Sequence, residues 1–288
     1  MSYFYHLLIY FNIYLIVSLS LNLLITSGLF QIAHAAFYGL GAYITAIILT
    51  KLGWGFFPTF FFTTLLTGFF SLLVSLPAWR FKEDYFVMLS LAVQVSIIAL
   101  MENWESLTNG VYGISSIPRF DILNYKLDSI ENFLVFSSIL SLVCLFIMYL
   151  LLHSPWGRIL KAMRDDELAT RGLGKNTRLI KLQTFFISCS MVSIAGLIYS
   201  TYTGYVDSTS FSIDESILMI SMVIVGGVGT LRGSIVGSFI LILIPEVLRF
   251  LHFSDSIAAN LRLLIYGVLL LLICHFRPQG LAGVYRVK

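Results

Sequence analysis

The sequence is poor in charged residues. Asp, Glu, Lys and Arg make up only 11% of its 288 residues, whereas 58% are hydrophobic. A soluble globular domain carries about 25% charged residues, because its surface has to face water. The composition therefore excludes a soluble protein of one or two cores and predicts a chain that crosses a membrane several times.

Other absences narrow the classes of function. The net charge of +3 is too small to indicate a nucleic-acid partner. The three cysteines, Cys144, Cys189 and Cys274, lie in apolar stretches and form neither a disulfide framework nor a metal-binding spacing. The five histidines are isolated from one another, and no H-E-x-x-H motif is present. We therefore expect no catalytic residue and no metal site.

The chain also lacks a nucleotide-binding motif of the Walker A type. Gly174-Lys175-Asn176 has neither the Ser or Thr that follows the lysine of that motif nor its upstream glycine. A proton-coupled carrier usually has a carboxylate or histidine relay within the membrane, and every acidic residue except Glu246 lies in or beside a predicted loop. A secondary transporter remains possible, because a sodium site lined by backbone carbonyls would need no charged side chain. Otherwise the energy for transport enters from a partner.

Long uncharged runs predict the membrane-spanning segments, because about 20 helical residues cross the hydrocarbon layer. Residues 1–50 contain no charged side chain, and Ser27-Gly28 is the natural break between two crossings. A membrane barrel would instead show alternating segments of about ten residues. We therefore predict an all-α, polytopic transmembrane helical bundle with about eight to nine crossings, formed by residues 1–288 as a single domain. The predicted segments are 4–25, 28–50, 57–78, 85–101, 133–152, 182–201, 216–248 (in and back) and 261–276.

The charges between the segments predict their orientation. Residues 158–181 carry seven basic and three acidic side chains, and the positive-inside rule puts them in the cytoplasm. Residues 102–131 carry five acidic and two basic side chains, and residues 207–215 carry only acidic ones, so both face outside. The N-terminus then starts outside, and 216–248 turns near Arg232. Further basic residues mark a cytoplasmic turn (Arg80 and Lys82) and a cytoplasmic C-terminus (Arg277, Arg286 and Lys288).

The cytoplasmic loop at 153–181 has signals for two short helices. Ser154 can cap the first helix, with Pro155 in its first turn. Asp165 or Asp166 can cap a second helix over 167–173, which Gly174 ends. Two amphipathic helices at the membrane face suit a docking surface for a partner, although a solvated loop has the same composition.

Four ordered stretches carry a resemblance to a known family. They are 21–24 (LNLL) with 31–43 (QIAHAAFYGLGAY), 157–174 (GRILKAMRDDELATRGLG), 225–233 (VGGVGTLRG) and 276–281 (FRPQGL). Together they resemble the LivM-type permease subunit of bacterial branched-chain amino acid ABC importers, over about residues 18–284. In this resemblance the loop at 157–174 corresponds to the coupling loop that docks on an ATPase subunit. Its matching positions are Gly157, Arg158, Lys161, Ala162, Arg164, Glu167, Leu168, Ala169, Leu173 and Gly174.

The resemblance implies a transport subunit of the bacterial inner membrane, surrounded by lipid, that catalyses no reaction itself. Its implied partners are a homologous LivH-like permease, two LivG/LivF-like ATPases that bind ATP-Mg, and a periplasmic or lipid-anchored solute-binding protein. This chain itself would bind no cofactor. The implied solutes are leucine, isoleucine, valine or related small molecules. A urea or short-chain amide importer is the alternative within the family, and a stand-alone secondary transporter is the alternative from another class.

Polar residues in the first two segments are candidates for the translocation path. Gln31 and His34 are three residues apart, and on one helix they would share a face among small residues. They can line a path or hydrogen-bond neighbouring helices, and the same alternatives hold for Asn22 and Gln94. The candidate path set is Asn22, Gln31, His34, Gly39 and Gly41.

A glycine-rich tract interrupts the run at 216–248. Gly229, Gly233 and Gly237 follow a G-x-x-x-G spacing, which is typical of closely packed membrane helices. Gly226 and Gly227 precede them and permit a broken helix, whose free amides could face a carboxylate of the solute. Close packing and a broken-helix binding site therefore both remain open. Glu246, next to Pro245, is expected at the membrane interface.

Overall fold

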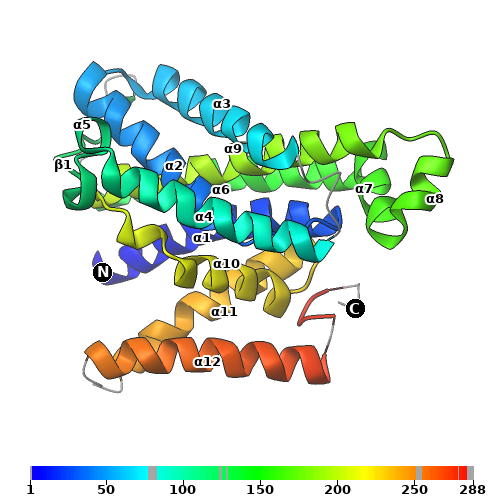
Figure 1. The fold of residues 1–288 in the computed structure, drawn as a ribbon. Coiled ribbons are helices and arrows are strands. Elements are labelled where there is room, and N and C mark those ends of the chain that lie inside the picture. The colour runs from blue at the N-terminus through cyan, green and yellow to red at the C-terminus, as the bar shows by residue number, and fades with distance from the viewer. Residues whose placement is uncertain are drawn as a thin grey trace.

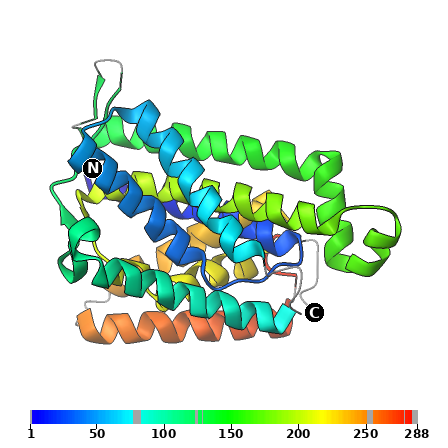
Figure 2. The ribbon, with the colours of Figure 1, turned by 45° about the horizontal axis from the view of Figure 1, so that its top comes forward.

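The computed structural model describes residues 2–76, 83–122, 125–127, 129–250, 255–277 and 279–283. It is a bundle of long helices whose axes run broadly alongside one another (Figures 1 and 2). Eight of the described helices are long and apolar enough to cross a membrane, and Leu263–Ile273 is a shorter apolar stretch. The predicted all-α bundle with eight to nine crossings is thus confirmed.

The long helices follow the predicted segments in order. They are α1 (Ser2–Thr26), α2 (His34–Ile47, continued by a π-helix at Ile48–Leu52), α3 (Phe56–Ser75), α4 (Glu83–Asn103), α6 (Ile130–His153), α9 (Thr177–Thr203), α10 (Ile213–Gly226), α11 (Leu231–Phe250) and α12 (Asp255–Phe276). The helix α9 begins five residues before its apolar run, because the Asn176 side chain caps it by accepting a hydrogen bond from the Leu179 amide at 3.1 Å. The predicted end of the third segment, Ala78, lies outside the described residues.

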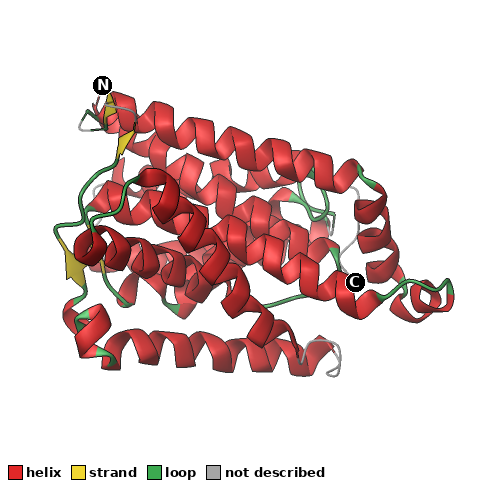
Figure 3. Cartoon of the chain, turned by 90° about the horizontal axis from the view of Figure 1, so that it is seen from above, coloured by secondary structure: helices red, strands yellow, loops and turns green. Residues whose placement is uncertain are grey.

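Short elements connect the long helices. They are α5 (Glu105–Thr108), α7 (Pro155–Asp165), α8 (Glu167–Gly172), two 3₁₀ turns (Gly110–Tyr112 and Thr209–Phe211) and the strands β1 (Ile114–Ser115), β2 (Asp121–Ile122), β3 (Tyr125–Lys126) and β4 (Tyr205–Val206). The strands form two antiparallel pairs, β1 with β4 and β2 with β3. Figure 3 shows these strands gathered at one end of the red helical bundle.

The two ends of the bundle carry opposite charge. Pairing of β1 with β4 brings residues 102–131 and 207–215 together, and we call these residues the acidic end. Residues 158–181, which we call the basic end, lie with α7 and α8 at the opposite end of the bundle (Figure 1). The chain starts near the acidic end, and its described C-terminal residues lie toward the basic end. Arg80, Lys82, Arg286 and Lys288 lie outside the described residues.

Small side chains let the helices approach closely around α9. Thr59, Thr63 and Thr67 recur every four residues on α3, and all three are fully buried. A Cβ atom added to Gly68 would lie 2.4 Å from the Ser190 hydroxyl on α9, and one added to Gly41 would lie 2.6 Å from the Cα atom of Ser193. Lipid tails are as apolar as leucine, so close contact of this kind, rather than a hydrophobic driving force, holds membrane helices together.

Candidate functional site

The loop at the basic end forms the two short helices that were predicted. The Ser154 hydroxyl accepts a hydrogen bond from the Gly157 amide at 3.2 Å, and Pro155 stands at the first helical position of α7. The Asp166 carboxylate accepts from the Ala169 amide at 2.9 Å and caps α8. Gly174 has a φ of +76°, which a glycine adopts without strain, and it ends this turn. Both predicted caps are confirmed, and Asp166 is the one that starts α8.

One ion pair holds α8 against α9, and a second lies within α8. The Lys181 ammonium lies 2.7 Å from Oε2 of Glu167, and the Arg171 guanidinium lies 3.2 Å from its Oε1. Partial burial raises the pKa of Glu167, but the hydrogen bond and charge of Lys181, with Thr177 and Arg171, outweigh it, so the pKa lies below its ordinary value. Glu167 is therefore ionised at neutral pH, and its partners fix the position of α8.

The outer surface of α8 combines charge with exposed apolar side chains. Leu168 is 75% exposed and Leu173 is 79% exposed. Both lie on a loop that extends beyond the bundle. On the inner side, a Cβ atom added to Gly28 would lie 3.3 Å from the Cα atom of Arg164. The helix α7 therefore touches the connection between α1 and α2, and a displacement of α7 would reach that connection directly.

Asn22 ties α1 to the glycine-rich turn. Its Nδ2 group donates to the Thr230 carbonyl at 2.9 Å and to the Ser234 hydroxyl at 2.8 Å, and its Oδ1 accepts from the Gly229 amide at 2.8 Å. Asn22 is fully buried. The Gly229 amide is thus bonded within the chain rather than free to face a carboxylate of the solute. The contacts of Asn22 favour its helix-packing role over a role in the path.

The glycines of the turn allow very close contact of α10 with α11. A Cβ atom added to Gly237 would lie 1.9 Å from the Met222 carbonyl oxygen, and one added to Gly226 would lie 2.0 Å from the Gly233 carbonyl oxygen. Gly229 lies in the turn itself, before α11 begins, so Gly233 and Gly237 alone carry the packing ladder on the helix. The close-packing function of this tract follows directly from these contacts.

The C-terminal tail completes this region. The Leu281 and Ala282 amides donate to the Val225 and Gly226 carbonyls, both at 2.9 Å. A Cβ atom added to Gly227 would lie 2.3 Å from the Gly283 nitrogen. Two of the stretches that carry the family resemblance, which are about 50 residues apart in the sequence, therefore meet at the end of α10. We call Asn22, the turn at 226–234 and the tail at 280–283 the turn cluster.

The spacing predicted that Gln31 and His34 share a helix face. This prediction is wrong, because α2 begins only at His34. Gly28, with a φ of +80°, ends α1, and residues 29–33 form an irregular connection. The two side chains nevertheless meet: Nε2 of Gln31 lies 3.1 Å from Nδ1 of His34, whose Nε2 lies 2.8 Å from the Ser20 hydroxyl. All three side chains are fully buried within the chain.

The remaining path candidates pack against neighbouring elements. A Cβ atom added to Gly39 would lie 2.7 Å from the Phe211 ring, and Gly41 contacts α9. Gln94 on α4 accepts from the Ala36 amide at 3.0 Å and donates to the Phe211 carbonyl at 2.9 Å. These polar contacts hold α2 and α4 together and leave the transport roles of Gly39 and Gly41 as predictions.

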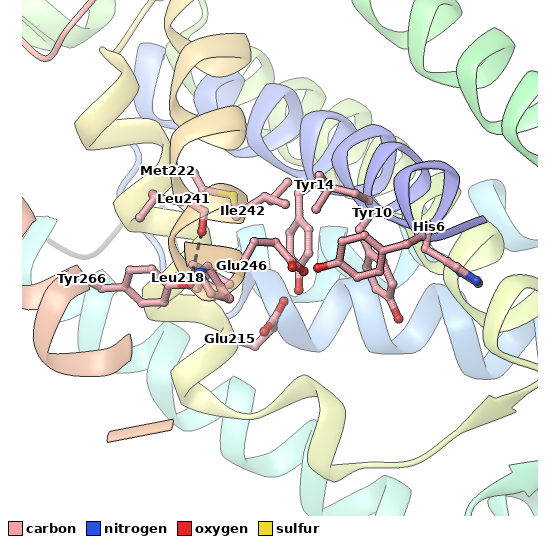
Figure 4. Close-up of a pocket in the computed structure, with 13 residues that line it drawn as sticks. His6, Tyr10, Tyr14, Glu215, Leu218, Met222, Leu241, Ile242, Glu246 and Tyr266 are labelled. Carbon is pink, nitrogen blue, oxygen red and sulfur yellow. Dashed lines mark hydrogen bonds between the residues drawn. The ribbon is translucent and has the colours of Figure 1, made fainter. Parts of the chain in front are cut away.

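A cavity that the sequence did not indicate lies between α1, α10, α11 and α12 (Figure 4). Its volume is about 460 Å³. Figure 4 shows the oxygen atoms of Tyr10, Tyr14, Glu215 and Glu246 directed toward one another. Other lining residues include His6, Leu218, Met222, Leu241, Ile242 and Tyr266.

Glu246 and Glu215 each lie near one end of a long helix. Glu246 lies two residues before the end of the apolar span Leu231–Leu248, so its place at the interface stays a prediction, and Glu215 lies in the first turn of α10 rather than in a loop. Both side chains line the cavity. His6, Tyr10 and Tyr14 recur every four residues on α1, and this polar stripe was the signal that could have predicted the cavity. Among the described residues, no three His, Cys, Asp or Glu side chains gather as a metal site.

Comparison with known proteins identifies the family. Residues 3–274 match the family described as the branched-chain amino acid transport system / permease component. The chain belongs to this permease family. It is 29% identical to the high-affinity branched-chain amino acid transport system permease protein LivM of Escherichia coli, over 95% of this chain and 68% of that protein.

More distant relatives agree. A probable LivM permease of Methanocaldococcus jannaschii is 29% identical over 72% of this chain and 62% of that protein, so the chain spans about two thirds of the length of these relatives. The permease LivH of Escherichia coli is 21% identical over 89% of this chain and 86% of that protein. No solved structure matches the chain. This multi-pass membrane protein is therefore a transport permease, which confirms the resemblance that its motifs carry.

Proposed function

We propose that this chain is the LivM-type transmembrane subunit of an ATP-driven importer that moves leucine, isoleucine or valine across the bacterial inner membrane. The printed names of its LivM and LivH relatives support the solute class. The same relatives support pairing with a LivH-like permease. Two ATPase subunits would hydrolyse ATP-Mg and a binding protein would deliver the solute, while this chain would bind no cofactor and catalyse no reaction.

The exposed apolar surface at α8, formed by Leu168 and Leu173, is the observation that carries this proposal. Leu168 and Leu173 are each more than 70% exposed on a loop whose helices are rigidly capped and ion-paired. Exposed apolar side chains that gather on one face with a polar rim are typical of a surface that another protein covers. We assign the ATPase contact to this face, with residues 157–174 as the coupling loop and Glu167 and Gly174 shaping α8.

The inner contacts of α7 supply a route for coupling. The backbone of Arg164 touches Gly28, and the connection that begins at Gly28 contains Gln31 and leads to His34. A shift of α7 by a bound ATPase would therefore move the junction of α1 with α2. The roles of Asn22, Gln31 and His34 along the path stay predictions, since the three side chains are buried within this chain.

The charge distribution supports the orientation. The basic end, with the described C-terminal residues near it, would face the cytoplasm, and the acidic end would face the binding protein. Residues 153–181 and 102–132 would be the cytoplasmic coupling loop and the external loop.

Reconstitution tests the proposal. The chain is purified with its permease and ATPase partners in proteoliposomes, and uptake of leucine and of urea is measured with and without ATP. We expect leucine uptake that requires ATP. Uptake of urea instead would favour the amide importer, and uptake of either solute without ATP would favour a secondary transporter.

The docking surface is tested in the same complex. Leu168→Asp and Leu173→Asp change exposed side chains, so the permease should still fold while the ATPase subunits are lost on co-purification. Val111→Asp is the matched control, because Val111 is 67% exposed at the acidic end. Full retention of the ATPases by both leucine variants would remove the docking role of this face.

A further inference from the structure

The cavity between α1, α10, α11 and α12 could hold a small molecule, and the family assignment does not say which one. It lies toward the acidic end, where α1 and α10 both begin. Its volume of about 460 Å³ falls within the range of about 300 to 1,000 Å³ that is typical of small-molecule sites. Under the proposed orientation, it faces the side from which the solute arrives.

The cavity is polar at one level and apolar below it. Glu215 lies near the start of α10, and Met222 lies seven residues further along the same helix, which is about 10 Å deeper into the bundle. On α11, which runs in the opposite direction, Glu246 stands at the same polar level and Leu241 lies deeper. An occupant with a charged head and an apolar tail would match this gradient.

The carboxylates indicate the sign of the head group. The Oε2 atom of Glu246 is shielded from solvent and accepts no hydrogen bond from any described residue. An acceptor oxygen buried without a donor is costly. Glu215 is directed at the same space, with the Tyr14 hydroxyl beside it. Two carboxylates that share one cavity repel each other, and a cation between them relieves both the repulsion and the missing donor.

We propose that this cavity is an external subsite that binds the ammonium group of the arriving amino acid at Glu246 and Glu215. The branched side chain then rests on Leu218, Met222 and Ile242, and the tyrosine hydroxyls lie beside the head group. This inference rests on the proposed function, because it names the recognition chemistry of the same solute. It also makes a prediction of its own: an amine of matching shape binds here, and a carboxylic acid of matching shape does not.

Binding to the purified importer without its binding protein tests the subsite. The complex in lipid nanodiscs is titrated with leucine, with 3-methylbutylamine, which lacks the carboxylate, and with 4-methylpentanoate, which lacks the amine. We expect leucine and the amine to bind and the acid to fail. Glu246→Gln and Glu215→Gln keep the side-chain shape and should each weaken binding of both amines by about 10-fold or more, since each removes a negative charge that pairs with the ammonium group.

Asp214→Asn is the matched control. It removes one negative charge from the residue next to Glu215, but Asp214 is exposed and does not line the cavity. Its affinity for leucine and 3-methylbutylamine should stay at the wild-type value. Equal binding of 4-methylpentanoate and 3-methylbutylamine, or unchanged affinity in Glu246→Gln and Glu215→Gln, would overturn the subsite.

The two proposals fail in different ways. If the wild-type complex shows no ATP-dependent uptake of leucine, the proposed function is wrong, while the preference for amine over acid still decides the chemistry of the cavity. If the wild-type complex takes up leucine and both glutamine variants do so with an unchanged KM, the proposed function stands and the subsite is wrong.

Discussion

The helices α1, α10 and α11 meet in two places that differ in almost every physical respect. At the turn cluster, Asn22 uses its donor and acceptor atoms within the chain, and backbone lies on backbone at Gly226 and Gly237. Toward the acidic end, the same helices separate around a cavity of about 460 Å³, with a buried oxygen of Glu246 that receives no donor from the described residues. One contact is closed and satisfied, and the other is open and unsatisfied.

This difference shows how one set of membrane helices can have one contact that stabilises the fold and another that is available for binding. Within the bilayer a polar group is satisfied by protein or lines a space that admits water or solute. The turn cluster takes the first course and holds α10 and α11 together. The cavity takes the second course, and the cost of its unpaired oxygen is tolerated because the turn cluster stabilises the same helices.

The largest effect is expected from Gly237→Ala. The new methyl group would lie 1.9 Å from the Met222 carbonyl oxygen, so α10 and α11 would have to move apart. Overpacking against backbone lowers the free energy of unfolding by about 3 kcal/mol. Thermal unfolding of the purified protein in detergent measures the loss.

Gly267→Ala on α12 is the control for this change, because nothing lies within 4 Å of its new methyl group. It should leave the unfolding temperature unchanged or slightly raised. Equal destabilisation by the two substitutions would show that the turn cluster is not closely packed.

A smaller effect is expected from Asn22→Ala. It leaves the Gly229 amide without its acceptor and the Thr230 carbonyl without the amide donor, which should cost about 1 to 3 kcal/mol of unfolding free energy. Asn103→Ala is the comparison, since Asn103 bonds only the Ala99 carbonyl of its own helix on an exposed face. If both variants unfold alike, Asn22 does not hold the turn.

The smallest effect is expected at the wall of the cavity. Pro245 within α11 has no amide hydrogen for the Leu241 carbonyl, and the Tyr266 hydroxyl donates to that carbonyl at 3.3 Å instead. Tyr266→Phe should therefore lower the unfolding free energy by about 0.6 kcal/mol, the average for such bonds in membranes. In a Pro245→Ala background the helix restores its own bond, and Tyr266→Phe should then cost less than it does beside Pro245. An equal cost in both backgrounds would rule out this compensation.

Local signals in the sequence predicted much of this molecule. The uncharged runs predicted the long helices, and Ser154 with Pro155 predicted the start of α7, because span length and helix capping depend on neighbouring residues. The prediction that Gln31 lies in a helix was wrong. Gly28 adopts a positive φ, and the irregular connection after it continues as far as His34.

Local sequence signals could not predict the contacts between residues that are distant in the sequence. Asn22 meets Gly229 only after α11 folds back along α1, and the cavity joins side chains from His6 to Tyr266. Glu215 was interpreted as a loop residue for the same reason: its charge shows in the sequence, but the helices that enclose it do not.

Labelling of single cysteines tests most directly whether the cavity is open to the outside and the turn cluster is closed. In a complex whose Cys144, Cys189 and Cys274 are replaced by Ala, Leu218→Cys places a thiol in the cavity and Ser234→Cys places one in the turn cluster. A membrane-impermeant maleimide should modify the Leu218→Cys variant from the outside only, more slowly in the presence of leucine, and should modify the Ser234→Cys variant from neither side. Labelling of the Leu218→Cys variant from the cytoplasmic side, or equal labelling of both variants, would contradict the account.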